Sequence, residues 1–345
     1  MTYEEIMMKL RNNQYAPVIV LSGEEPYYID AVTDYIEQNA LDAASQAFDQ
    51  VVLYGRDLPS ADIAYAISQA RGFSMMGGRK VVIVKEAQAV KKWEALGLYL
   101  DNPQPTSVLA IAIKGKVDGR LTLWKDFEKK GGILLKTEKL RDDKVAAWIT
   151  NYIAKRNDEL RQKGDEVTID PRVAELLAAS IGADLNTIVA AIQKLIDGRP
   201  EGKHVIDAEL VERNIGISKD YNVFELQKAL IMGDVMAANR ITQYFATSKD
   251  HPMQKELGVL YGFFANLMLY HYCPNKANER EVAAALGVNP FFVRDYAAAA
   301  RRYNAAKTMK IIGYFREIDA RSKGVNNNSA KDDDLWKELI YKILH

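Results

Sequence analysis

Five short apolar runs alternate with helical patterns in the first 136 residues, and this alternation constrains the fold more than any other feature of the chain. The runs are Val18–Leu21, Val51–Tyr54, Lys80–Val84, Ser107–Ile113 and Gly132–Lys136. Strands that are buried on both faces read as continuous apolar runs, and parallel neighbours need a crossover segment between them. The pattern therefore predicts a parallel sheet that is flanked by helices.

The strand pattern stops after Lys136. Apolar residues such as Val145, Ile149 and Ile153 then recur at helical spacing, so the remainder is expected to be almost entirely helical. A chain of 345 residues is long for one core. We expect an α/β domain over residues 1–136, a small all-α domain over 137–213 and a larger all-α domain over 214–345.

Several residues mark where helices begin. Asp170 is placed to cap a helix that has Pro171 at its first position. Asn326–Ser329 reads as a loop, and Asp334 after it is expected to cap the last helix. The apolar residues from Leu335 to Leu344 fall on one face of that helix.

Residues 17–30 have the strand, turn and helix order of a phosphate-binding P-loop but lack its chemistry. A working P-loop surrounds the phosphates with backbone N–H groups of a glycine-rich turn, and then presents Gly-Lys-Ser/Thr. Here Gly23 is the only glycine, Glu24 and Glu25 would repel phosphate, and Pro26 lacks an N–H group. The segment predicts the architecture of a nucleotide-binding domain without the residues that bind phosphate and support catalysis.

The chain has equal numbers of basic and acidic residues, 46 of each. A neutral molecule has no global positive field for nucleic acid or membranes, so any DNA contact has to be local or shared with other subunits. The single cysteine, Cys273, excludes a disulfide framework and fits a reducing compartment. Because no apolar run approaches the roughly 20 residues of a membrane span, we expect a cytoplasmic protein without a membrane partner.

No group of residues has the spacing of a catalytic or metal site. Of the four histidines, only His271 lies near a different ligand type, Cys273, and no second pair stands at a usable distance. That pair fits the end of a helix before Pro274. The carboxylates read as solvated charges on helical faces. We therefore expect no catalytic residue, no metal and no cofactor.

Residues 282–303 place Gly287 between two helical patterns, as in a helix-turn-helix motif. A recognition helix presents Arg, Asn, Gln or Ser near its start to read base edges. The second helix here begins with Pro290 and two phenylalanines and continues with four alanines. This composition favours packing within the protein over reading of a DNA groove.

The segment Phe73–Lys80 joins a helix over residues 63–70 to a buried strand and has two interpretations. Its two glycines break the helix, and a loop there should be polar. Exposed methionines beside such a turn would suit a surface that inserts into a hydrophobic pocket of a partner. Alternatively, Met75 and Met76 fill the core of their own domain.

The stretch Ile318–Val325 also has two interpretations. Arg321, Ser322 and Lys323 form the last turn of a long helix, with Gly324 as a natural cap, and helix capping alone explains them. A cationic helix end can also lie near DNA phosphates, which makes Arg321 and Lys323 possible DNA-proximal residues.

With these segments in view, the chain resembles the delta subunits of bacterial DNA polymerase III, the clamp-loader subunits that open the sliding clamp. Seven segments in the family's order carry the resemblance over nearly the whole chain: Leu21–Tyr27, Phe73–Lys80, Lys116–Arg120, Gly182–Leu185, Tyr221–Leu226, Asn289–Val293 and Asp319–Gly324. The resemblance implies an AAA+-like first domain without ATPase activity, a helical lid over 137–213 and a helical collar over 214–345.

The resemblance also implies a site and partners. In this family a hydrophobic pair after a helix of the first domain inserts into a pocket of the clamp, and that pair falls on Met75 and Met76, beside Phe73. The family more often has Leu or Phe there, but the flexible methionine chain can fill the same pocket. The implied partners are the beta sliding clamp, the motor and delta-prime subunits of the loader, and primed DNA within the assembly.

Two other functions remain as alternatives. An active AAA+ ATPase or helicase-type subunit would need a lysine near Gly23 and a paired acidic motif after Val108–Ile113, where Lys114 and Lys116 stand instead. A stand-alone helical DNA-binding protein is opposed by the neutral charge. Under the favoured interpretation the chain is a part of the polymerase holoenzyme with no catalytic site of its own.

Overall fold

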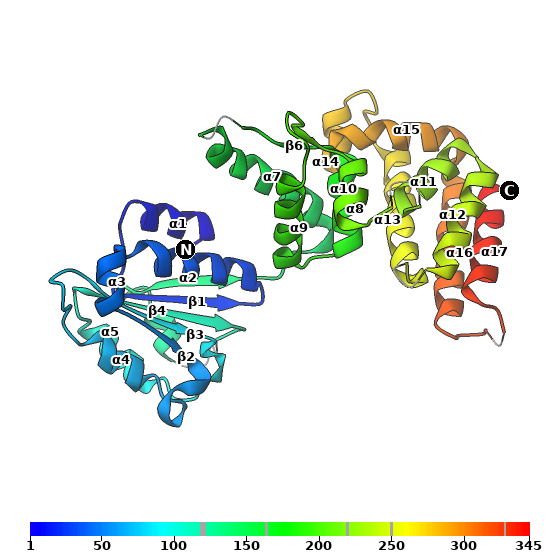
Figure 1. The fold of residues 1–345 in the computed structure, drawn as a ribbon. Coiled ribbons are helices and arrows are strands. Elements are labelled where there is room, and N and C mark those ends of the chain that lie inside the picture. Colours follow the sequence, from blue (N-terminus) through cyan, green and yellow to red (C-terminus); the bar gives the residue numbers. More distant parts are fainter. Residues whose placement is uncertain (118–121, 163–164, 219–220, 249–250, 328) are drawn as a thin grey trace. The chain divides into compact units, whose positions relative to one another are not determined.

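The computed structural model of the chain describes residues 1–117, 122–162, 165–218, 221–248, 251–327 and 329–345 (Figure 1). The chain divides into two compact units, Met1–Leu140 and Arg141–His345. The further division of the second unit into a lid over 137–213 and a collar over 214–345 stays a prediction. Asp118–Arg120 of the quoted segment Lys116–Arg120, and Asn328 of the expected loop, lie outside the described residues.

The first unit is built on a parallel five-stranded sheet with the strand order β2-β3-β4-β1-β5. The strands are β1 (Val18–Gly23), β2 (Gln50–Tyr54), β3 (Lys80–Lys85), β4 (Ser107–Lys114) and β5 (Ile133–Thr137). The predicted parallel sheet is confirmed, and each predicted strand agrees with an observed one to within two residues. β1 lies between β4 and β5, and every one of its residues is buried.

Helices cover both faces of this sheet (Figure 1). The helices α1 (Tyr3–Arg11) and α2 (Pro26–Asn39) pack on the face that contains Ile19 and Leu21. The helices α4 (Ala64–Ala70) and α5 (Glu94–Asp101) pack on the opposite face, which contains Val18 and Val20. Successive residues of β1 thus enter different cores, which explains why the strand reads as an unbroken apolar run. The remaining elements of this unit are α3 (Ala43–Asp49), α6 (Thr122–Asp126) and the 3₁₀ turns η1 (Gly55–Asp57), η2 (Pro59–Ala61) and η3 (Ala87–Ala89).

The second unit begins with four helices and two very short strands. They are α7 (Asp142–Arg161), β6 (Thr168–Ile169), α8 (Pro171–Ile181), α9 (Leu185–Asp197), β7 (Val205–Ile206) and α10 (Ala208–Ile215). The expected cap of α8 is confirmed, because the Asp170 side chain accepts a hydrogen bond from the N–H group of Arg172. The expectation that strands stop after Lys136 is wrong here, since β6 and β7 pair in parallel. Strands of two residues are too short to show alternation in the sequence.

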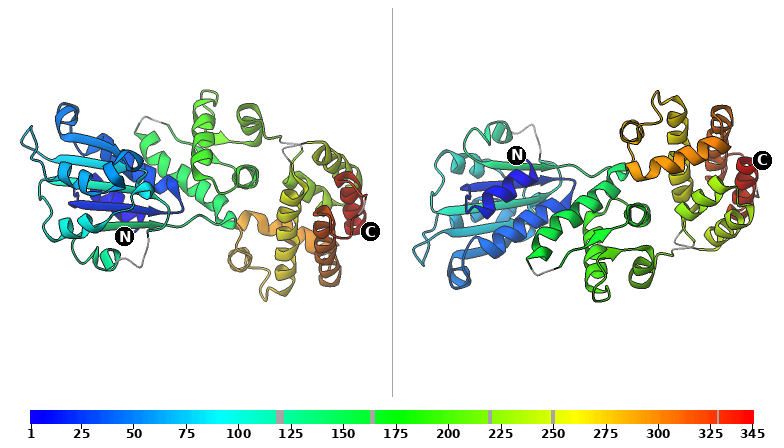
Figure 2. Two further views of the ribbon diagram at one scale, coloured as in Figure 1. Left: turned by 90° about the horizontal axis from the view of Figure 1, so that it is seen from below. Right: turned by 90° about the horizontal axis from the view of Figure 1, so that it is seen from above.

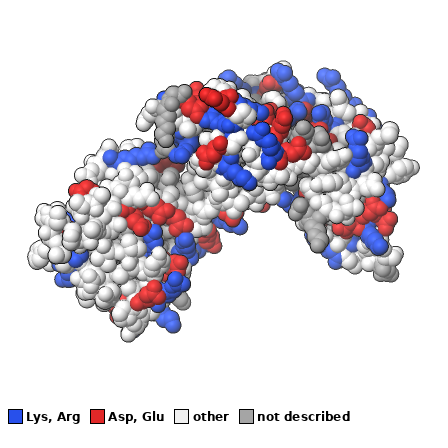
Figure 3. Space-filling model, viewed as in Figure 1, with Lys and Arg blue, Asp and Glu red and all other residues white. Residues whose placement is uncertain are grey.

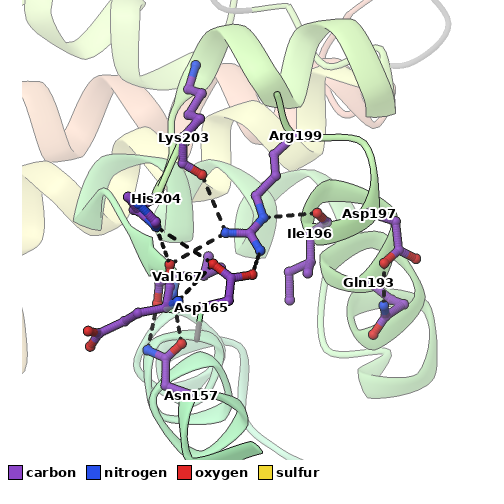
Figure 4. Close-up of polar contacts among 10 residues, drawn as sticks. Asn157, Asp165, Val167, Gln193, Ile196, Asp197, Arg199, Lys203 and His204 are labelled. Atoms are coloured by element: carbon purple, nitrogen blue, oxygen red, sulfur yellow. Dashed lines mark hydrogen bonds and ion pairs between the residues drawn. The ribbon is translucent and has the colours of Figure 1, made fainter. Parts of the chain in front are cut away.

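Polar contacts fix this small sheet to the surrounding helices (Figure 4). The buried Asn157 side chain of α7 donates to the Val167 carbonyl at 2.7 Å and accepts from the Val167 N–H group at 2.8 Å. The Arg199 guanidinium pairs with Asp165 and donates to the Ile196 carbonyl at 3.1 Å. Its hydrogen bond and charge hold the pKa of the Asp165 carboxyl below its usual value.

The rest of the second unit is a helical array around one core that extends from Val223 to Leu344. Its elements are α11 (Val223–Met232), α12 (Val235–Thr247), α13 (Met253–Tyr272), α14 (Glu279–Leu286), η4 (Pro290–Phe292), α15 (Val293–Arg302), α16 (Ala305–Ser322) and α17 (Asp332–Leu344). The two long helices α13 and α16 lie side by side (Figure 2). The expected cap of α17 is wrong by three residues: the helix begins at Asp332, and Asp334 accepts a hydrogen bond from the Lys331 N–H group. The apolar face of α17 is buried as predicted.

Charged side chains of both signs are interspersed on the face shown in Figure 3. This mixture matches the net charge of zero. Within the described ranges, no helix is long and apolar enough to cross a membrane.

Candidate functional site

The segment after α4, residues 71–79, forms a loop that exposes three large apolar side chains; we call it the tip loop. Phe73 is 80% exposed, Met75 is 76% exposed and Met76 is 54% exposed. The alternative interpretation, in which the two methionines fill the core of their own domain, is therefore wrong. Phe48, which directly precedes the end of α3, is also exposed and gave no signal in the sequence.

A buried carboxylate fixes the backbone of the tip loop. Asp49, the last residue of α3, is 1% exposed, and its Oδ1 accepts a hydrogen bond from the Met75 N–H group at 2.7 Å. Its Oδ2 accepts from the Ser74 hydroxyl at 2.7 Å and from the Met76 N–H group at 3.0 Å. These hydrogen bonds, that of Ser74 first, hold the pKa of the Asp49 carboxyl below its usual value.

Two further contacts shape the C-terminal half of the tip loop. The Ser74 hydroxyl oxygen accepts a hydrogen bond from the Gly78 N–H group at 3.0 Å, across a turn in which Gly77 has φ +75°. Such a φ is costly for a residue with a side chain, so a glycine is required there. Arg79 then donates to Asn13 at 3.1 Å, and its guanidinium lies 4.3 Å from the centre of the Tyr15 ring.

The turn between β1 and α2 is the place where a P-loop would hold phosphates, and here its N–H groups bind the protein itself. The N–H group of Gly23 donates to the Gly115 carbonyl at 2.9 Å, and that of Glu24 donates to the Thr137 carbonyl at 3.1 Å. The N–H group of Glu25 donates to the Thr137 hydroxyl at 3.3 Å. The donors that a phosphate would need are therefore occupied by the ends of β4 and β5.

The steric environment and the charge of this turn also disfavour a bound phosphate. A Cβ atom on Gly23 would lie 2.0 Å from the Thr137 carbonyl oxygen, so the end of β5 fills the volume beside the turn. The buried Glu25 carboxylate accepts from the Tyr27 N–H group at 3.2 Å and caps α2. A carboxylate thus occupies the positive end of the helix, where a phosphate would otherwise be favoured. Lys116 lies 3.0 Å from Glu24 rather than facing an open turn.

The end of α16 carries both possible DNA-proximal residues, and each has an acidic neighbour. A guanidinium nitrogen of Arg321 lies 2.7 Å from Oε2 of Glu338 in α17, and Nζ of Lys323 lies 2.7 Å from Oδ2 of Asp319. The helix end is capped as expected, since the Gly324 N–H group donates to the Arg321 carbonyl at 3.0 Å. The proximity of Arg321 and Lys323 to DNA stays a prediction.

The helix-turn-helix-like segment and the His271 segment have structural roles. In α15, Val293, Tyr296 and Ala299 are buried in the helical core, as expected for packing rather than groove reading. His271 lies in the last turn of α13, where its Nε2 is 2.8 Å from the Tyr303 carbonyl oxygen. In the described part of the chain, no group of three or more His, Cys, Asp or Glu residues could hold a metal ion.

Sequence reasoning missed the residues that fix the tip loop and the turn between β1 and α2. Asp49 stands 26 residues before Met75, and nothing in its neighbourhood marks it as a loop anchor. Thr137 ends β5, one residue beyond the predicted strand, and is brought beside Gly23 only by the pairing of β1 with β5. Both contacts depend on the strand order of the sheet, which a single sequence does not reveal.

Two family models match the chain. The model described as DNA polymerase III, delta subunit, matches residues 20–137, which contain the tip loop and the turn between β1 and α2. The model described as DNA polymerase III delta subunit, C-terminal domain, matches residues 220–336. Together they cover most of both units.

Individual relatives agree with these matches. DNA polymerase III subunit delta of Bacillus subtilis is 25% identical over 350 residues, which cover 97% of this chain and 95% of that protein. The solved structure of the Bacillus subtilis DNA clamp loader delta protein covers 99% of each chain at 22% identity, with a TM-score of 0.50. The Thermotoga maritima RuvB Holliday junction branch migration motor is more distant: it covers 86% of this chain and 85% of its own at 14% identity, with a TM-score of 0.36.

Proposed function

This chain belongs to the DNA polymerase III delta subunit family, and from that premise we propose that it binds the beta sliding clamp and opens it for loading on primed DNA. The observation that carries the proposal is the tip loop of the first unit. It presents Met75 and Met76 to solvent on a backbone that is already fixed by Asp49. Two exposed, unbranched apolar side chains on a fixed loop suit insertion into a hydrophobic pocket.

Opening of the clamp then requires no covalent reaction catalysed by this chain. ATP bound by neighbouring motor subunits arranges the loader, and the first unit of this chain meets the clamp. A surface that binds the open clamp more tightly than the closed clamp shifts the population toward the open state by that difference in affinity. Phe73 and the two methionines supply the apolar contact for this difference.

We also propose that this chain neither binds nor hydrolyses ATP. The support is the occupied turn, where Thr137 accepts hydrogen bonds from the N–H groups of Glu24 and Glu25 that a phosphate would need, and Glu25 caps α2. The chain is then a non-catalytic part of the polymerase holoenzyme and acts in the cytoplasm. An active ATPase would need an open turn and a lysine that this segment lacks.

The remaining partners are assigned to the second unit. In this proposal residues 214–345 form a collar that joins the motor and delta-prime subunits, and Arg321 and Lys323 lie near primed DNA. Residues 141–345, which form one compact unit, should co-purify with the other loader subunits but not with the clamp. Retention of the clamp by that fragment would move the clamp-binding surface out of the first unit.

A pull-down of the purified full-length chain with its beta clamp, with and without ATP, tests the proposal. Because the tip loop is exposed and preformed in the chain alone, the clamp should be retained equally in both conditions. Retention only with ATP, or no retention at all, would contradict it.

A further inference from the structure

The tip loop is held to its domain by polar contacts rather than by its apolar residues. Phe73, Met75 and Met76 are exposed and add nothing to the core. Arg71 and Gly72 at its start contact α4, and Arg79 at its end donates to Asn13. Between them, the described contacts that fix the loop to the domain are the hydrogen bonds of Ser74, Met75 and Met76 to one carboxylate. The conformation of the apolar surface therefore depends on Asp49.

The position of Asp49 makes it a rigid anchor. It ends α3, and the next residue, Gln50, begins β2 of the sheet. Both carboxylate oxygens accept hydrogen bonds from the loop, and Ser74 extends the set to the Gly78 N–H group. The hydrogen bonds draw the N–H groups of Met75 and Met76 inward, while their side chains remain exposed.

A loop without this anchor would be less ordered. The N–H groups of Met75 and Met76 would return to water, and the two following glycines would allow many backbone conformations. Ordering such a loop on binding lowers affinity, whereas a loop that is already ordered avoids that loss.

We infer that Asp49 is a positioning residue for clamp binding, which fixes the tip loop in the conformation that presents Met75 and Met76 to the clamp. The inference rests on the proposed function, because the partner is the clamp assigned there. Asp49 itself is buried and need not touch the clamp. Among the described residues, the hydrogen bonds of its carboxylate all go to the tip loop, so its loss should act on the loop.

Four single variants of the full-length chain separate positioning from general stability. Asp49→Ala removes every acceptor, Asp49→Asn keeps one oxygen and the shape, and Ser74→Ala removes the hydroxyl from a half-buried loop position. Asp57→Asn is the control, since Asp57 is an exposed aspartate of the same unit that pairs only with Arg56 among the described residues. Clamp affinity is measured by calorimetry and loop order by amide hydrogen exchange over residues 71–79.

The expected order of effects follows from the acceptors lost. Asp49→Ala should weaken clamp binding by about 10- to 100-fold, and Asp49→Asn and Ser74→Ala by about 3- to 10-fold. Exchange of the Met75 and Met76 amides should rise in the same order. Asp57→Asn should change neither quantity.

A double-mutant cycle decides whether Asp49 acts through the methionines. In a chain that already carries Phe73→Ser, Met75→Ser and Met76→Ser, Asp49→Ala should weaken the residual binding by less than about 2-fold, because none of the exposed apolar side chains of the tip loop is left to position. A full additional loss in that background would overturn the inference. So would unchanged binding in Asp49→Ala, or unchanged exchange of the two amides.

The same experiment distinguishes the inference from the function on which it rests. A wild-type chain that fails to bind the clamp overturns the proposed function, and the partner named here falls with it. A wild-type chain that binds, with Asp49→Ala binding equally well, overturns the positioning role alone.

Discussion

The backbone N–H group of Met75 donates a 2.7 Å hydrogen bond to the buried Asp49 carboxylate, 26 residues earlier in the chain. This contact joins a rigid helix end to a loop whose apolar side chains face solvent. It gives the exposed methionines a fixed presentation, which a sequence pattern of Met-Met-Gly-Gly does not supply by itself.

The isolated chain should neither bind nor hydrolyse ATP, because Thr137 occupies the N–H groups of the turn after β1. Equilibrium dialysis with labelled ATP and a phosphate-release assay measure this, with a motor subunit of the loader as the positive control. Micromolar binding with magnesium-dependent turnover would show that the turn can open.

The tip loop should stay ordered at neutral pH and loosen only in acid. Hydrogen bonds from Ser74, Met75 and Met76 lower the pKa of Asp49 in the folded chain, and the charged group that faces it is Lys80. A lowered folded pKa stabilises the fold above the unfolded value of about 3.9 and loses that stabilisation as the pH falls through the folded value.

Methyl NMR spectra of the methionines test this pH dependence. The signals of Met75 and Met76 should remain constant from about pH 8 down to about pH 5 and move only below about pH 4. The signal of Met8, an exposed methionine on α1, is the internal control. A transition of the two loop signals near neutral pH would assign the anchor to another group.

Asn157→Ala should destabilise the second unit by about 2 to 4 kcal/mol, because it leaves the N–H and C=O groups of Val167 without their partner in a buried place. Urea unfolding followed by circular dichroism measures the loss. Asn151→Ala, at an exposed position on the same helix, is the matched control and should change stability by less than about 0.5 kcal/mol. An equal loss of stability in the two variants would contradict the structural role proposed for Asn157.

Arg321→Gln together with Lys323→Gln should lower the DNA-stimulated ATPase of the whole loader and leave clamp binding unchanged. If both residues contact phosphates, the salt dependence of DNA binding should weaken by a slope of about 1 to 2. Neutral glutamine is preferred to charge reversal, because a carboxylate at position 321 would face Glu338. Lys337→Gln on α17 is the control, and an unchanged ATPase at low salt would leave Arg321 and Lys323 with capping and ion pairing only.

The sheet could be predicted from the sequence because its central strands are buried on both faces and form continuous apolar runs, and the half-buried edge strand β2 is apolar as well. The short strands β6 and β7 could not, because two residues carry no periodic signal. The misplaced cap of α17 has a related cause: Asp332, Asp333 and Asp334 are adjacent acids, and any of them satisfies the local rule for a helix start.

The candidate site was predictable only in its exposed part. Met75 and Met76 stood out because methionines beside two glycines are unusual for a loop. Asp49 and Thr137 did not, since each acquires its role from a partner that the strand order brings close. The pairing of Arg321 with Glu338 was hidden as well, because it joins α16 to α17 and depends on how these two helices pack.

The most direct test of clamp binding by the tip loop is the affinity and the melting temperature of one variant, Met75→Ser with Met76→Ser, measured beside wild type. We predict that the loss of two exposed apolar anchors weakens clamp binding by about 2 to 4 kcal/mol, or about 30- to 1000-fold, and leaves the melting temperature unchanged. Met8→Ser, an exposed methionine of the same unit, should change neither value. Wild-type affinity in the double variant would contradict the account.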